Sequence, residues 1–181
     1  YLSDDEMCNL RCWSCRCEIK RHNVGDEKQA QLTNQIVREF LSSTDWLSLL
    51  HSGEVLASER HMQLLESIDV DSNPRLQVEL FTNGTLLPSR WPRLANVHEA
   101  IKQSTISIDA ASREVYEQVR PPARWERVTA ALKLVKQLRD GGLPYFQCNF
   151  VARRANYRDI LPFADMCLEH GATAVRYTVL D

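Results

Sequence analysis

The residues of this chain that could do chemistry are concentrated in one short segment near its start. Cys8, Cys12 and Cys15 follow the spacing C-x3-C-x2-C, and Cys17 comes two residues after the last of them. A loop of this length can gather its thiolates around one soft metal centre, because thiolates are the ligands of zinc sites and of iron–sulfur clusters. We therefore interpret the segment as a metal-binding loop.

The spacing of the cysteines distinguishes between kinds of metal centre. A structural zinc site needs four ligands, usually from two separated C-x2-C pairs or from one pair with histidines. The other cysteines, Cys148 and Cys167, are far from the loop in sequence, and bacterial ferredoxins use C-x2-C-x2-C. Three thiolates at C-x3-C-x2-C can hold three corners of a cubane cluster and leave one iron open to a ligand. The alternative from another functional class is a non-catalytic zinc-binding domain, with Cys17 as the fourth ligand.

Composition excludes several classes of protein. The chain has 181 residues, of which 44% are hydrophobic and 25% charged, which suits one globular domain. A net charge of −2 gives no electrostatic reason to expect nucleic-acid binding. No apolar run approaches the roughly 20 residues of a membrane helix, so we expect no membrane partner. Clustered free thiols in a chain of this size indicate the reducing cytoplasm rather than a disulfide framework.

Strand and helix patterns alternate along the whole chain. Regular alternation predicts a parallel sheet with right-handed crossovers, in the order β(αβ)5. The chain begins at Tyr1 rather than Met and closes on a predicted strand, so we expect residues 1–181 to be one domain cut from a longer protein. Strands are predicted at 1–6, 46–50, 76–81, 105–109, 145–152 and 173–181. One predicted helix follows residues 25–26, one begins at Ser58, and two cover 89–101 and 112–119. A long helix follows residues 121–122 and ends at 141–142, and the last runs from Asn156 to Gly171.

The predicted strands have one apolar face and one polar face. In 105–109, for example, the polar residues alternate with Ile106 and Ile108. A doubly wound sheet would be apolar on both faces. A curved sheet with a wet inner face explains the pattern, so we predict an open partial barrel with its site at the carboxyl ends of the strands. Glu79 and Arg176 are inward charges that could pair with each other or face a substrate.

The cysteine motif, placed in the loop after the first predicted strand, resembles the signature of the radical S-adenosylmethionine (SAM) enzymes. The resemblance covers about residues 5–180. It implies a partial TIM barrel of the (β/α)6 type, a 4Fe-4S cluster held by Cys8, Cys12 and Cys15, and SAM as the second cofactor. The segments 81–87, 106–111 and 149–151 resemble the subgroup with a C-terminal SPASM or twitch extension, which would lie beyond Asp181.

The resemblance also implies where SAM binds. The segment Ser52-Gly53-Glu54-Val55 corresponds to the family's Gly-Gly-Glu-Pro, whose backbone and glutamate hold the amino group of SAM. Arg120 corresponds to an arginine expected to pair with the SAM carboxylate, with Arg127 as the competing candidate. The remaining SAM contacts are expected from Ser107 and Asp109 at the ribose, from Asn149 and Val151 at the adenosine, and from the backbone of Ser14 at the adenine amino group.

The activity implied by the resemblance is radical chemistry. SAM chelates the open iron, an electron from a flavodoxin- or ferredoxin-type donor cleaves its sulfonium bond, and the resulting 5′-deoxyadenosyl radical takes a hydrogen from the substrate. The subgroup favours a peptide or protein side chain as that substrate, and a sugar, nucleotide or other small biosynthetic metabolite is the second candidate. The outcome, whether a crosslink, epimerisation, oxidation or rearrangement, is left open by the sequence.

Overall fold

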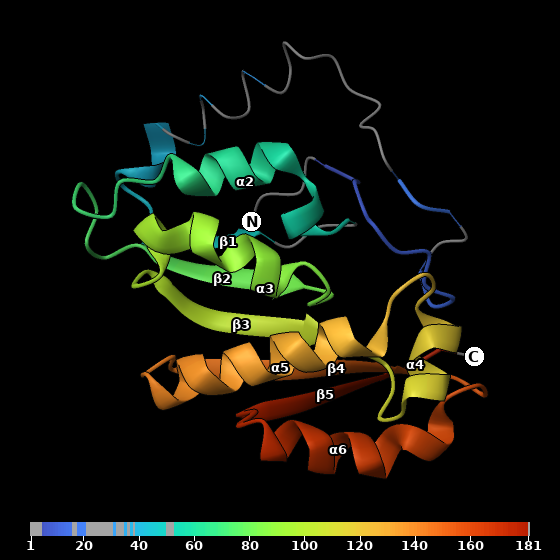
Figure 1. Ribbon diagram of the computed structural model, residues 1–181. Helices are drawn as coiled ribbons and strands as arrows, with labels where there is room; N and C mark the ends of the chain where they lie inside the picture. Colours follow the sequence, from blue (N-terminus) through green and yellow to red (C-terminus); the bar gives the residue numbers. More distant parts are fainter. Residues whose placement is uncertain are drawn as a thin grey trace.

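The computed structural model describes residues 5–15, 18–20, 31, 35, 37, 39–49 and 53–180. In this part of the chain one sheet of five parallel strands is present, and its strands are paired in the order β1-β2-β3-β4-β5 (Figure 1). The strands are β1 (Trp46–Leu49), β2 (Gln77–Thr82), β3 (Ile101–Ser107), β4 (Tyr145–Ala152) and β5 (Ala174–Val179).

The strand order decides where the helices lie. Parallel strands that pair in chain order are joined by crossovers of one hand, so the helices between them cover a single face of the sheet. This arrangement is an α/β partial barrel, as predicted. The helices are η1 (Val55–Ala57), α2 (Glu59–Glu66), α3 (Leu87–Arg90), η2 (Trp91–Val97), α4 (Arg113–Val119), α5 (Trp125–Asp140), η3 (Tyr157–Asp159) and α6 (Ile160–Glu169), where η marks a 3₁₀ helix.

The burial of the strands confirms one apolar and one wet face. On β4, buried and partly exposed residues alternate without interruption along the strand. Phe146, Cys148 and Phe150 are buried among the helices, while Gln147 and Asn149 are partly exposed on the opposite face. β2 alternates in the same way. The concave face is therefore accessible along the length of these strands, and the hydrophobic core lies between the convex face and the helices.

A serine cap and a glycine turn fix where α2 begins and how the chain leaves β2. Ser58 caps α2 as predicted, because its Oγ accepts a hydrogen bond from His61 N at 3.2 Å. Gly84 follows β2 with φ +79°, and a Cβ there would come within 3.0 Å of Ile106 Cγ2 on β3. Glycine is therefore required at this turn, both for its backbone conformation and for the close contact with β3.

Two predicted helices differ in the structure. The helix predicted over 89–101 is instead α3 followed by η2, and Ile101 already begins β3. Proline stands in the first turn of both helices, at Pro88 and Pro92, and Leu94 has non-helical backbone angles. Because proline lacks the N–H that a continuous helix needs, the segment breaks into short turns. Asn156 precedes η3 but makes no side-chain cap.

Two predictions fall partly on residues outside the described ranges. For the predicted first strand, residues 1–4 are outside and residues 5–7 are not in a strand. The helix predicted after 25–26 is helical at its described positions Val37, Phe40 and Leu41. Phe40 was predicted to face inward and is 63% exposed, so that part was wrong. In the described part of the chain, no helix has the length and apolarity that crossing a membrane requires.

Candidate functional site

The cysteine loop is attached to the end of α4 by its backbone. Arg11 N donates to Pro121 O at 2.8 Å and Trp13 N donates to Val119 O at 3.0 Å. In Figure 1 the loop, drawn in blue, lies beside α4. Because backbone groups make these bonds, the loop has a defined shape whatever side chains it carries.

Side chains tie the other end of the loop to the turn after β2. Asn9 Nδ2 donates to Thr85 Oγ1 at 2.9 Å, and Asn83 Nδ2 donates to Asn9 Oδ1 at 3.0 Å. Asn83 Oδ1 also accepts from Thr85 N at 3.0 Å. From the sequence, Thr82-Asn83-Gly84 could be a feature of the SPASM or twitch subgroup or simply an ordinary turn. In the structure this turn supports the cysteine loop. Asn9 lies between Cys8 and Cys12, but nothing in its local sequence indicates that it bonds to Asn83 and Thr85.

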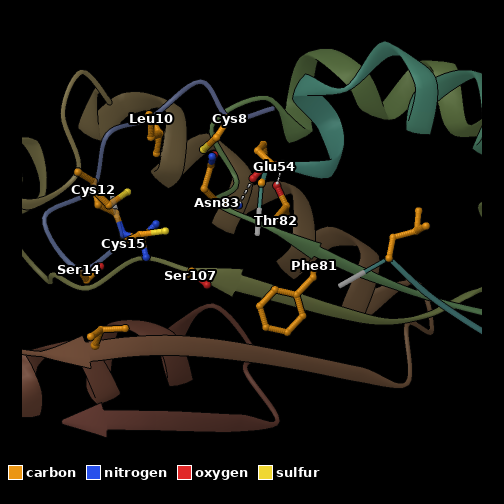
Figure 2. Close-up of a pocket in the computed structure, with 14 residues that line it drawn as sticks. Cys8, Leu10, Cys12, Ser14, Cys15, Glu54, Phe81, Thr82, Asn83 and Ser107 are labelled. Atoms are coloured by element: carbon orange, nitrogen blue, oxygen red, sulfur yellow. Dashed lines mark hydrogen bonds between the residues drawn. The ribbon is translucent and has the colours of Figure 1, made fainter. Parts of the chain in front are cut away.

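The three cysteines line one cavity of about 250 Å³ at the carboxyl ends of the strands. Figure 2 shows their sulfur atoms directed toward a shared space. Within the described residues, no three His, Cys, Asp or Glu side chains are grouped so that they could hold a single metal ion. The other lining residues are Leu10, Ser14, Leu49, Gly53, Glu54, Phe81, Thr82, Asn83, Ser107, Arg120 and Val151.

The thiols differ in environment. Cys12 is buried, Cys8 is partly buried and Cys15 is exposed. Burial raises the pKa of the Cys12 thiol, and the positive charge of Arg120 acts in the opposite direction. A metal ligand must be a thiolate, so Arg120 favours the form of Cys12 that ligates. Cys17, the fourth ligand of the alternative zinc site, lies outside the described residues.

Glu54 is a buried carboxylate at the edge of the cavity, 2% exposed. Thr82 Oγ1 donates to its Oε1 at 2.5 Å, and Asn83 N donates to its Oε2 at 2.6 Å (Figure 2). Burial raises the pKa of the Glu54 carboxyl, and the hydrogen bonds from Asn83, Thr82 and Leu56 oppose this in part. An ammonium group bound beside Glu54 would stabilise the charged form that burial disfavours.

This raised pKa predicts a pH dependence of stability in the cofactor-free protein. The folded state holds a proton on Glu54 more tightly than the unfolded state, so its stabilising contribution is present below the unfolded pKa and is lost as pH rises through the folded pKa. Relative to Glu54→Gln, which does not titrate, the unfolding free energy of the wild type should fall as pH rises above the ordinary pKa of a glutamate and should level off above the raised pKa of the folded state. Urea unfolding at several pH values measures the difference, and a constant or rising difference would contradict the prediction.

Asp109 and Arg120 form a buried ion pair behind the cavity. Arg120 donates to Asp109 Oδ2 from Nη2 at 2.7 Å and from Nε at 3.0 Å. Asp109 Oδ1 accepts from Val151 N at 2.7 Å, and Ser14 Oγ lies 3.5 Å from Oδ2. Arg120 lines the cavity while Asp109 does not. Asp109 therefore holds Arg120 in place, and its contact with the ribose of SAM stays a prediction.

Asn156 completes this arrangement from the turn after β4. Its Nδ2 donates to Asp109 O and Val151 O, both at 2.9 Å, and its Oδ1 accepts from Arg153 N at 2.7 Å. Asn156, which the sequence predicts as a helix cap, thus holds the backbone of Asp109, whose φ is +65°. A left-handed conformation is uncommon outside glycine, although aspartate and asparagine tolerate it best. The contacts of Asn156 with Asp109 and Val151 secure the backbone there.

The structure brings most of the predicted SAM-binding residues to the cavity. Gly53, Ser107 and Val151 line it, as does Ser14. Asn149 is partly exposed on the concave face of β4, where it accepts from Gln147 Nε2 at 2.7 Å, but it is not a lining residue. Arg127, the competitor of Arg120, is exposed on α5. Ser52 lies outside the described residues.

Apolar lining residues were missed by sequence reasoning. Leu10 is 2% exposed and lines the cavity from within the cysteine loop. Phe81 is partly exposed on the concave face of β2, and Figure 2 shows it below the loop. The alternation of β2 was a usable signal, because it places Phe81 on the inner face with Glu79. For Leu10 the cysteine motif carries no signal, because the spacing of the cysteines says nothing about the residue types between them.

Residues 6–146 match the family model described as the radical SAM superfamily. Among curated proteins, the chain is 23% identical over 172 residues to the probable GTP 3′,8-cyclase of Methanocaldococcus jannaschii. That match covers 94% of this chain and 55% of the relative, so the chain spans about half of the relative's length.

Solved structures agree in fold. SuiB of Streptococcus suis bound to the precursor peptide SuiA is similar with a TM-score of 0.70 at 16% identity, over 99% of this chain and 38% of SuiB. The protein anSMEcpe with bound AdoMet has a TM-score of 0.64 at 20% identity, over 98% of this chain and 50% of that one. SuiB has also been solved bound to S-adenosylmethionine. At these identities the likeness establishes the fold and no more.

Proposed function

This chain belongs to the radical SAM superfamily, whose members use a 4Fe-4S cluster and SAM, and we propose that it cleaves SAM reductively at a cluster held by Cys8, Cys12 and Cys15. The observation that carries the proposal is the placement of three thiols around one cavity that also contains a buried carboxylate and a buried guanidinium, from Glu54 and Arg120. These are the groups that a ligand with one ammonium and one carboxylate requires.

Each residue of the cavity has a separate task in this proposal. The bound cofactors supply a 5′-deoxyadenosyl radical that removes a hydrogen from the substrate. Glu54 accepts hydrogen bonds from the SAM ammonium, and Arg120, aligned by Asp109, pairs with the SAM carboxylate. Leu10 and Leu49 reduce the access of water to the cluster side of the cavity. The backbone of Ser14 and Gly53, with Ser52, Ser107, Asn149 and Val151, orients the nucleoside and amino acid parts of SAM.

We propose a peptide or protein side chain as the substrate. The ligands bound in the similar structures support this choice, because SuiB binds the precursor peptide SuiA and anSMEcpe binds the Kp18Cys peptide. A nucleotide or other small metabolite is the second candidate, favoured by the likeness to the probable GTP 3′,8-cyclase. A flavodoxin- or ferredoxin-type protein would donate the electron, and we propose a C-terminal extension of the SPASM or twitch type beyond Asp181.

Anaerobic reconstitution tests the proposed function. The protein, given iron and sulfide and then SAM and dithionite, should become brown and release 5′-deoxyadenosine. The cluster should be visible as broad absorption before SAM is added. A colourless protein that binds one zinc ion tightly would contradict the proposal and support the zinc-binding alternative.

A further inference from the structure

A second charged site lies on the concave face of the sheet, next to the cysteine-lined cavity. Glu79, on β2, is partly exposed there, and both of its carboxylate oxygens are held in place. Ser48 Oγ donates to Oε2 at 2.7 Å, and Gln103 Nε2 donates to Oε1 at 2.6 Å. Ser48 comes from β1 and Gln103 from β3, at the positions paired with Glu79 in both neighbouring strands. Three strands thus converge to orient one carboxylate.

The hydrogen bonds leave this site rich in acceptors. Ser48 and one N–H of the Gln103 amide donate to Glu79, which leaves the carboxylate lone pairs and the Gln103 Oε1 as acceptors, with one Gln103 N–H as a donor. Neutral donors orient the negative charge without cancelling it. Among the described residues, no basic side chain forms an ion pair with Glu79, and Arg176, the other inward charge predicted from the sequence, is exposed on β5.

Thr105 places a buried hydroxyl on the same face of the sheet. Thr105 is 0% exposed, and its Oγ1 makes no hydrogen bond with any residue that the structure describes. It follows Gln103 by two residues on β3, so both lie on the same side of that strand. It is also paired in register with Phe81, which lines the cysteine cavity. An unpaired hydroxyl is costly in a folded protein, and a donor or acceptor from a ligand would satisfy it.

We propose that Glu79, supported by Ser48 and Gln103, binds a cationic group of the substrate, an ammonium or a guanidinium. Such groups carry only donors, three on an ammonium and five on a guanidinium, which matches the acceptors of the site. Glu79 is two residues before Phe81, so the cation would lie roughly 7 Å along the strand from the edge of the cavity. This inference rests on the proposed function, because it names a feature of the substrate that the radical would attack.

Binding of defined peptides to the reconstituted full-length protein with SAM tests the inference. The probes are acetyl-Gly-Lys-Gly-amide, the same peptide with arginine, and the same peptide with acetyl-lysine, which keeps the length but has no charge. The lysine or arginine peptide should bind about tenfold more tightly than the acetyl-lysine peptide. Glu79→Gln should abolish this preference, whereas Glu169→Gln, the same change at an exposed position of α6, should keep it.

Glu79→Asp separates the charge from the shape of the site. It keeps the negative charge and should keep a preference for the cationic peptides, even if Glu79→Gln cannot be obtained folded. Equal binding of all three peptides to the wild type, or a preference that survives Glu79→Gln, would overturn the inference. Release of 5′-deoxyadenosine by the wild type without peptide tests the proposed function separately, so the two failures can be distinguished.

Discussion

Replacing Cys8, Cys12 or Cys15 with alanine should lower the release of 5′-deoxyadenosine by roughly 100-fold or more, because in the proposed function each supplies one of three protein ligands to the cluster. The structure places all three on the wall of one cavity, so none can be replaced by a neighbouring thiol among the described residues. Iron content after anaerobic reconstitution and 5′-deoxyadenosine by chromatography are the two measurements.

Cys167→Ala is the matched control for the cysteine variants. Cys167 is a buried thiol on α6, away from the cavity, and its removal should leave the iron content unchanged. Its loss should cost about 1 kcal/mol of stability. Full activity in a triple alanine variant of the loop would end the hypothesis of a cluster at this site.

Asp109→Asn should lower the unfolding free energy by about 3–5 kcal/mol, because it leaves the buried Arg120 guanidinium without its counter-charge. Asp109 and Arg120 are 2% and 5% exposed, so water cannot replace the lost partner. Asparagine tolerates the left-handed backbone found at this position, so the change removes charge without adding backbone strain. Urea denaturation measures the effect, and the affinity for SAM should fall about tenfold because Arg120 loses its alignment.

Two further variants test this account of Asp109. Glu59→Gln removes an acid that pairs with Arg93 at the surface, and it should cost at most about 1 kcal/mol. The double variant Asp109→Asn with Arg120→Met should be more stable than Asp109→Asn alone, since no unpaired charge remains buried. If Asp109→Asn costs no more than Glu59→Gln, Asp109 does not hold Arg120 in the way described.

The sequence by itself predicted a thiolate metal centre and determined the layout of the sheet. C-x3-C-x2-C is a local feature, and its spacing favours a cluster site with an open iron over common zinc and ferredoxin sites. Strand alternation is equally local, so residue order was enough to predict the wet concave face and the site at the carboxyl ends of the strands. The long helix α5 and the cap at Ser58 were predicted for the same reason.

The tertiary structure decided what each polar residue does. Asn156 looked like a helix cap and instead fixes Asp109, 47 residues away in sequence. Asp109, which is predicted to bind the ribose, also forms a buried ion pair with Arg120 that the sequence does not predict, while the two inward charges Glu79 and Arg176 do not pair. Hydrogen-bonding side chains have several chemically equal partners, and only the packing of distant segments brings one of them within reach. Periodicity can assign such a residue to a face of the sheet, but its partner depends on the register between strands and on the loops that cover their ends.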